Sequence, residues 1–464
     1  MSRSRGYTAW HFLRWFTYAG SRGPARQRDD SLKRGFYLVM AAQALSSLAD
    51  NALFIAAIAL IQELRGPDWM APMMKWWFAA AYVLLAAFVG AFADSYPKGR
   101  VMFATNALKV AGCLLMFWYA SLGLPQSHQV LVVCAAYGLV GVGAAAYSPA
   151  KYGIVTEMLP PEQLVKGNSW IEGLTVISII LGTVLGGALI SPDVSAFLLA
   201  HPWLSGVVHT PAEAAILVIA LVYLAAAACN LLIPRTHVVY PPQQRNPVKL
   251  VRAFAGYVRI LWQDKLGQIS LAVTTLFWGA GATLQLIVIE WGRSHLGYRL
   301  DQASILMGVA AVGTVVGSVL AGRIPLRKAL SVLPVGAMMG VVVLLMPLVY
   351  SPASVYLLLL ITGGMAGFFV VPMNALLQHR GHVLLSAGHS IAVQNFNEQL
   401  NILLMVAAYT FMLWLDIPIN TIIVIFGLIV ISLMLLVMRW SRLNQVADPT
   451  LCDQIGEEGH GKAL

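Results

Sequence analysis

Long apolar segments alternate with short polar or Pro- and Gly-containing segments along most of the chain. A helix that crosses a bilayer needs roughly 20 mostly apolar residues. Twelve segments meet this requirement: residues 36–62, 71–93, 101–122, 129–149, 168–190, 213–233, 268–291, 302–321, 329–349, 353–377, 388–414 and 417–438. A membrane β-barrel would show short alternating segments instead. The pattern therefore predicts an all-α membrane protein with 12 transmembrane helices.

The longest interior polar segment divides these helices six and six. It predicts five regions: a basic N-terminal tail at 1–35, a six-helix half at 36–234, a central loop at 235–267, a second six-helix half at 268–438, and a C-terminal tail at 439–464. Within the central loop, apolar residues recur at helical spacing among Lys249, Arg252 and Arg259. This spacing predicts a basic amphipathic helix that lies on the membrane surface.

Composition and charge support a membrane protein and exclude nucleic-acid binding. Hydrophobic residues make up 59% of the 464 positions and charged residues only 11%, which a soluble protein could not accommodate. The net charge of +10 is unevenly distributed, because 25 of the 30 Lys and Arg residues fall in the tails and links on one side of the predicted membrane. By the positive-inside rule this side is cytoplasmic, so both termini are expected inside a bacterial inner membrane. The basic charge is expected to contact anionic membrane lipids.

The residues predict a protein that is not an enzyme and needs no cofactor. The four cysteines have neither metal-site nor disulfide spacing, so no metal site is expected. The chain contains neither a Walker A sequence nor a His-xxxx-Asp acyltransferase pattern. No apolar segment with a cleavage site follows the N-terminal tail, so no cleaved signal peptide is expected.

The two halves are weakly similar to each other. GVGAAAYSPAKYG, in the fourth segment, and GGMAGFFVVPMNALLQ, in the tenth, each place a Pro after small residues and a polar residue two positions later. Both halves then restart with Gly-X-Ser, at residues 167–169 and 388–390. We interpret Pro149 as the end of the fourth helix. Two similar six-helix halves joined by a basic loop indicate the major facilitator fold, in which substrate binds between the halves.

The sequence GAFADSYPKGR, between the second and third segments, resembles the major facilitator signature of a Gly, an Asp four residues later, and a basic cluster. Small residues let helices approach closely, and a carboxylate near a helix end can hold a neighbouring helix. We therefore predict a gating motif on the cytoplasmic side. Its residues are Gly90, Asp94, Lys98, Gly99 and Arg100.

Ionisable and strongly polar residues inside the apolar segments, or directly after the end of one, are the candidate binding residues, because exposing a charge to lipid costs about 2.5–3.5 kcal/mol or more. These residues are Asp50, Asn51, Lys109, Lys151, Glu172, Gln285, Asn395 and Glu398. Asp50 and Lys151 are expected either to pair across the cavity or to contact opposite charges on a substrate. For any single Asn or Gln, bonding between helices is the simpler interpretation.

LADNALF, FADSYPKGRVM, YGLVGVGAAAYSPAKYGIVTE, FWGAGATL and FFVVPMNALLQHRG with AGHSIAVQNFNE together resemble the bacterial lysophospholipid transporters of the major facilitator superfamily. The resemblance covers most of residues 36–438. It implies transport of lysophospholipids such as lysophosphatidylethanolamine from the outer to the inner leaflet. There a separate acyltransferase/acyl-carrier-protein synthetase would re-acylate them. It also implies headgroup recognition by Asp50 and Lys151. Gln285 stands where the family pattern has Arg. We expect a monomer.

Two other functions remain open from the sequence. The first is a proton- or cation-coupled exporter of amphipathic drugs, supported by Asp50 and Glu172 and by a partial antiporter-like glycine pattern at 173–187. Close helix packing is the simpler interpretation of these glycines. The second is a membrane scaffold that presents lipid to the acyltransferase without transporting it. Charges buried in several segments argue against the scaffold, because it has no need of them.

Overall fold

The computed structural model describes residues 24–455 except 67–69, 201–205, 207, 237, 239, 241, 244–245, 299 and 454. Every regular element in these residues is a helix. The long helices are α2 (Pro24–Glu63), α3 (Met70–Ser95), α4 (Lys98–Phe117), α5 (Gln126–Met158), α6 (Pro161–Ile190), α8 (Pro211–Leu231), α10 (Gly267–Ser294), α11 (Leu300–Ala321), α12 (Leu333–Leu344), α13 (Pro352–Leu384), α14 (Ala387–Trp414) and α15 (Ile419–Ala447). Shorter elements are α7 (Pro192–Leu199), α9 (Pro247–Gln263) and the 3-10 turns η1 (Tyr119–Leu122), η2 (Leu326–Val332) and η3 (Met346–Leu348).

Each of the twelve predicted segments contains one of these helices, and the ninth combines η2, α12 and η3. In the described residues, ten helical stretches are long and apolar enough to cross a membrane, and the residues Ile305–Ala321 of α11 form a shorter apolar helix. α14 has sufficient length but carries six Asn, Gln and Glu residues between 394 and 401. Polar groups within a membrane helix are expected to face the bundle interior. With α11 and α14 included, the helices match the prediction of twelve spans.

The prediction that a helix ends at Pro149 is wrong. α5 continues through Pro149 to Met158, and α13 continues through Pro372 to Leu384 in the same way. A proline removes one backbone hydrogen bond, but neighbouring helices in a membrane bundle can stabilise the interrupted segment. As a result, Lys151 lies inside α5 rather than just beyond its end.

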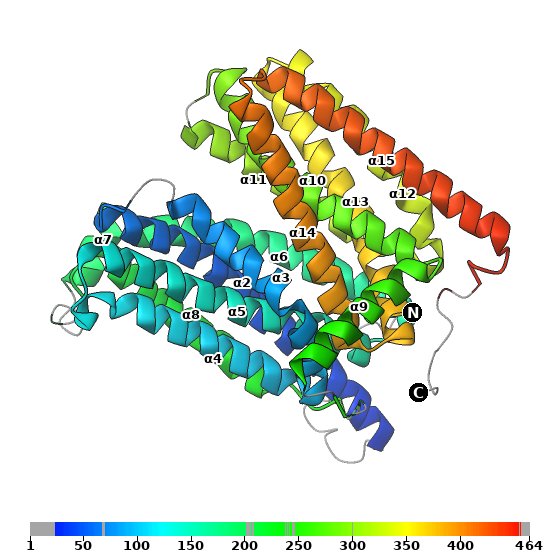
Figure 1. Ribbon diagram of the computed structural model, residues 1–464, viewed down its shortest axis with the longest axis horizontal. Coiled ribbons are helices and arrows are strands. Elements are labelled where there is room, and N and C mark those ends of the chain that lie inside the picture. The colour runs from blue at the N-terminus through cyan, green and yellow to red at the C-terminus, as the bar shows by residue number, and fades with distance from the viewer. Residues whose placement is uncertain are drawn as a thin grey trace, which may run out of the picture.

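The helices form two bundles, α2–α8 and α10–α15, which meet at the end of the molecule that carries α9 and diverge toward the end that carries α7 (Figure 1). We call these the closed end and the open end. Between the bundles, α3 packs against α14, and α6 packs against α11 and α13. The largest buried apolar cluster contains residues of both bundles, for example Ile154 and Val371.

The predicted amphipathic helix of the central loop is α9, which the side chain of Asn246 caps by accepting hydrogen bonds from the next turn. Its buried residues Phe254 and Leu261 join a cluster with α3 and α14. At its C-terminal end, Asp264 forms a bidentate pair with Arg380 of α13, at 2.6 and 3.1 Å. α9 therefore packs against both bundles where they are in contact with each other.

Candidate functional site

Asp50, on α2, lies in a polar network inside the first bundle. Lys109 of α4 donates to both carboxylate oxygens at 2.8 and 2.9 Å, and Tyr223 of α8 donates to Oδ1 at 2.5 Å. Lys109 also donates to Ser46 Oγ at 3.0 Å. The sequence hypothesis paired Asp50 with Lys151 or with a substrate, whereas its ion pair in the structure is with Lys109.

The two members of this ion pair differ in accessibility. The side chain of Asp50 is 22% exposed, but that of Lys109 is only 1% exposed. The Lys109 ammonium lies 5.3 and 5.4 Å from the ring centroids of Tyr147 and Tyr223, within the range of a cation–π contact. Of the two side chains, only the carboxylate is therefore accessible to a ligand. Lys109, a predicted binding residue, lies behind it.

The second bundle contributes its own carboxylate on α14. Gln394 donates to Glu398 Oε1 at 2.7 Å and to Asn374 at 3.1 Å. Glu398 is buried, so these hydrogen bonds hold its carboxylate within the polar part of α14.

The other predicted binding residues make separate contacts. Asn395 donates to Ser148 of α5 at 2.9 Å and so joins the two bundles. Asn51 donates to the backbone of its own helix at 2.8 Å. The Lys151 ammonium lies 4.0 Å from the centroid of the neighbouring Tyr152 ring. The side chain of Glu172 is outside the described residues.

A cavity of about 1160 Å³ lies between α6 and helices α10–α15 of the second bundle. The described residues that line it include no charged side chain and are mostly Val, Ile, Leu, Met, Ala and Phe. Gln285 lines it, as does Gln399, which follows Glu398 in sequence. The volume exceeds the usual range for drug-sized ligands, about 300–1,000 Å³. The described lining of this cavity is therefore almost entirely apolar.

The glycines of α6 separate this cavity from α2. A Cβ added at Gly182 would lie 3.0 Å from Cβ of Asn51, and one added at Gly186 would lie 2.8 Å from the backbone oxygen of Ala52. Two of the glycines that partly resemble the antiporter pattern thus serve close packing, as the simpler interpretation held. They also bring the cavity wall directly against the Asp50–Asn51 turn.

At the closed end, Asp94 lies at the C-terminal end of α3 and faces the N-terminus of α14. It accepts hydrogen bonds from Lys98, from Ser386 Oγ and, at 3.1 Å, from the backbone N–H of Gly388. His389 Nδ1 lies 3.1 Å from its other oxygen. We call these five residues the closed-end cluster. A carboxylate at a helix N-terminus meets free backbone N–H groups and the positive end of the helix dipole.

Of the remaining motif residues, Gly90 supports the same contact, whereas Gly99 packs within the first bundle. A Cβ added at Gly90 would lie 2.9 Å from the Cα of the α14 backbone, so only glycine fits there. Gly99 allows α4 to pass the backbone of α8 at a similar distance. Arg100 is exposed. Glu157, at the end of α5, lies 3.8 Å from the Lys98 ammonium and accepts from Tyr240 of the central loop at 3.0 Å.

A second polar contact between the bundles was not predicted from the residues. Asn168 and Gln378 exchange two side-chain hydrogen bonds between α6 and α13, at 2.9 and 3.0 Å. A signal was present, because the repeated Gly-X-Ser motif contains Asn168 in one half and His389 in the other. Both copies of the motif lie where the two bundles touch.

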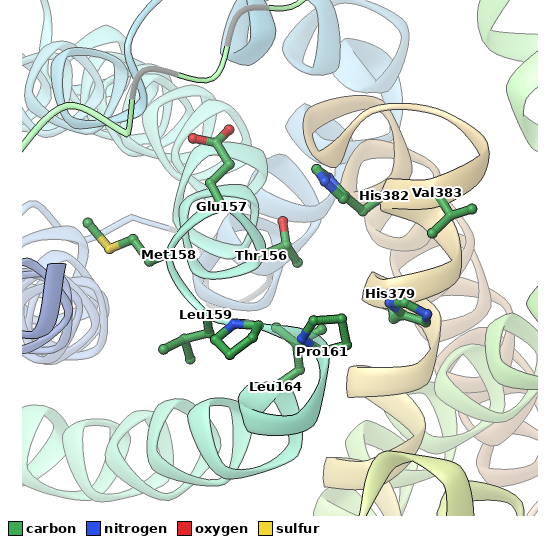
Figure 2. A pocket seen from close by; sticks show the side chains of 10 residues that line it. Thr156, Glu157, Met158, Leu159, Pro161, Leu164, His379, His382 and Val383 are labelled. Carbon is green, nitrogen blue, oxygen red and sulfur yellow. The ribbon is translucent and has the colours of Figure 1, made fainter. Parts of the chain in front are cut away.

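A smaller cavity of about 220 Å³ opens at the closed end, between the α5–α6 turn and the end of α13. Figure 2 shows Glu157 and Thr156 on one side and His379 and His382 on the other. The described side chains contain no group of three or more His, Cys, Asp or Glu that could hold a metal ion. This cavity marks another boundary between the bundles.

Two six-helix bundles, joined by a central loop and enclosing a site between them, define a secondary transporter of the major facilitator type. The family model described as Major Facilitator Superfamily matches residues 39–404, and the chain belongs to this superfamily. Over 391 residues it is 41% identical to the lysophospholipid transporter LplT of Yersinia enterocolitica and 39% identical to that of Pectobacterium carotovorum. Each alignment covers 84% of this chain and 89% of the relative, so the chain belongs to this transporter family.

Solved structures show the same fold. A bacterial homologue of the iron transporter ferroportin, in an outward-facing state, has a TM-score of 0.67 at 14% identity. FucP, in an outward conformation, has a TM-score of 0.67 at 13% identity. Both comparisons cover 89% of this chain and 99% of the other chain. The predicted fold, family and transporter class are confirmed.

Proposed function

We propose that this protein moves lysophospholipids, of the lysophosphatidylethanolamine class, from the outer to the inner leaflet of a bacterial inner membrane. The observation that carries the proposal is the division of the site into a charged side, with Asp50, and a large apolar cavity in the second bundle. A lysophospholipid has one zwitterionic headgroup and one acyl chain, so it matches both parts. The names of the relatives support the same substrate class.

In this proposal the exposed edge of Asp50 accepts hydrogen bonds from the substrate ammonium. Glu398, Asn51 and Asn395 contribute further polar groups to the headgroup site. Lys151 binds the phosphate. Hydrogen bonds between charged groups are about twice as strong as neutral ones. The acyl chain occupies the apolar cavity, where burial of each CH₂ contributes about 0.8 kcal/mol. Gln285 contributes an uncharged amide to that cavity.

The direction of transport rests on the charge distribution of the chain. The closed end carries the basic turn between α3 and α4 and the basic helix α9, so the positive-inside rule places it, and both termini, in the cytoplasm. The open end then faces outward. Alternating opening of the two ends around the fixed site would deliver the lipid inward. A separate acyltransferase would consume it there, and the transporter would act as a monomer.

The experiment follows labelled lysophosphatidylethanolamine in vesicles that contain the purified protein. Loss of one charge-assisted hydrogen bond costs about 1.5–3 kcal/mol. Asp50→Asn should therefore lower the transport rate about 10- to 150-fold. Lys151→Ala should also lower it. Asp193→Asn, which changes an exposed carboxylate on α7, is the matched control and should retain the wild-type rate.

The outcomes separate the alternatives. If Asp50→Asn and Lys151→Ala both move lipid as fast as the wild type, the site assignment is wrong. Movement of amphipathic drug cations without lipid movement would select the exporter. Binding of the acyltransferase without any lipid movement in vesicles would select the scaffold.

A further inference from the structure

Lys109 is a buried charge that direct substrate binding does not explain. Its side chain is 1% exposed, so a headgroup between the bundles cannot reach it without displacing Asp50. A buried ammonium is unfavourable unless it is paired and hydrogen-bonded. The role of Lys109 must therefore lie in what it does to its neighbours.

The surroundings of the ammonium resemble a coordination shell. Three oxygen atoms lie within 3.0 Å of Nζ: both carboxylate oxygens of Asp50 and Oγ of Ser46. Two more oxygens are hydrogen-bonded to these three rather than to the ammonium itself. Tyr223 donates to Asp50, and Asn106 Oδ1 accepts from Ser46 at 2.9 Å. Carboxylate, hydroxyl and amide oxygens are the ligands that hard metal cations prefer in proteins.

We propose that Lys109 is a built-in counter-cation for Asp50 and occupies the place where a small inorganic cation would otherwise bind. The proposal rests on the proposed function in one respect, the use of Asp50 as a headgroup ligand. It makes Lys109 a positioning residue. The tethered ammonium balances the buried charge and orients the carboxylate, while the exposed edge of Asp50 stays available to the substrate. It follows that transport by the wild-type protein requires neither Na⁺ nor Li⁺ from the medium.

A purely structural role for Lys109 makes a different prediction. If the lysine only supports the packing of α2 against α4, its removal weakens the protein equally in every salt. If it replaces an inorganic cation, its removal creates a requirement for one. The dependence on the cation distinguishes the two roles.

The experiment compares wild type, Lys109→Met and Lys166→Met in vesicles containing NaCl, LiCl or choline chloride. Lys166 is an exposed lysine on α6 and serves as the matched control. Wild type and control should transport equally in all three salts. Lys109→Met should lose about tenfold or more in choline, because it leaves a buried carboxylate unpaired, and should recover several-fold in Na⁺ or Li⁺.

A second measurement needs no lipid. Thermal unfolding of the purified protein, followed by tryptophan fluorescence, should show that Na⁺ or Li⁺ raises the melting temperature of Lys109→Met relative to choline but leaves the wild type unchanged. A ligand that binds only the folded state stabilises it in this way. If Lys109→Met does not fold, Lys109→Gln takes its place, since it keeps a donor to Asp50 without the charge.

Two results would overturn the proposal. One is a variant of Lys109 that is impaired to the same degree in all three salts, in transport and in unfolding. The other is a wild-type protein whose transport or melting temperature falls when choline replaces Na⁺ and Li⁺. If the wild type moves no lysophospholipid in any salt, the proposed function fails, and the unfolding measurement still decides the role of Lys109.

Discussion

Replacement of Asp94 by Ala should shift the protein away from the conformation in which the closed end is shut. Asp94 belongs to the first bundle, whereas Ser386, Gly388 and His389 belong to the second. These contacts exist only while α3 and α14 touch, so they stabilise the conformation in which the closed end is shut. Lys98 contacts Asp94 within the first bundle, and this contact does not depend on the bundles being together.

The size of the shift follows from the hydrogen bonds between the bundles that the substitution removes. A hydrogen bond to a charged group contributes about 1.5–3 kcal/mol. Two such bonds, from Ser386 and Gly388, give about 3 kcal/mol at the lower limit. About 1.4 kcal/mol corresponds to a tenfold change in an equilibrium constant. The ratio of molecules with this end closed to molecules with it open should therefore fall about 100-fold.

Spin labels placed at Gln163 and Lys328 measure this shift, because these exposed positions lie at the closed end on opposite bundles. Pulsed electron resonance on a background without the native cysteines should give one short distance for the wild type. Asp94→Ala should add a longer distance as the main population. Asp453→Ala, which removes an exposed carboxylate beyond α15, is the control. An unchanged distance distribution in Asp94→Ala would refute the reasoning.

Two further predictions use the same labelled pair. Gly90→Ala should also populate the longer distance. Its Cβ would lie 2.9 Å from the α14 backbone, which cannot move aside as a flexible side chain can. Gly138→Ala is the control, because a Cβ there meets nothing within 4 Å, and it should leave the distances unchanged. Asn168→Ala and Gln378→Ala should each shift the population, and a double-mutant cycle should give a coupling of about 1–2 kcal/mol for their two exchanged hydrogen bonds. Additive effects of the two substitutions would contradict a direct contact.

Hydrophobicity predicted the helices because the bilayer thickness fixes how long an apolar segment must be. All twelve segments contain helices, and α9 also lies where amphipathic spacing placed it. The predicted ends of the helices were less accurate. α5 continues past Pro149, because packing within a bundle can compensate for the lost backbone bond and a single sequence does not reveal that packing.

The partner of Asp50 could not be obtained in the same way. Hydrophobicity identified both Lys109 and Lys151 as buried charges, but which of them meets Asp50 depends on the rotation and tilt of α4 and α5. Packing against neighbouring helices sets these quantities. For the same reason, the motif around Asp94 was recognised, while its partner Ser386 was not. A motif specifies one side of a contact, and the fold supplies the other.

The two carboxylates between the bundles suggest how a substrate could change the conformation. Asp50 belongs to α2 of the first bundle and Glu398 to α14 of the second. A ligand shifts an equilibrium only by its difference in affinity between the two states. An ammonium held by both carboxylates would bind most strongly when the bundles approach around it, so it favours closure of the open end. The binding energy of this ammonium must also offset the loss of the hydrogen bonds of Asp94 at the closed end. The two from Ser386 and Gly388 contribute about 3 kcal/mol. An uncharged headgroup lacks that attraction, so it would enter the site without driving transport.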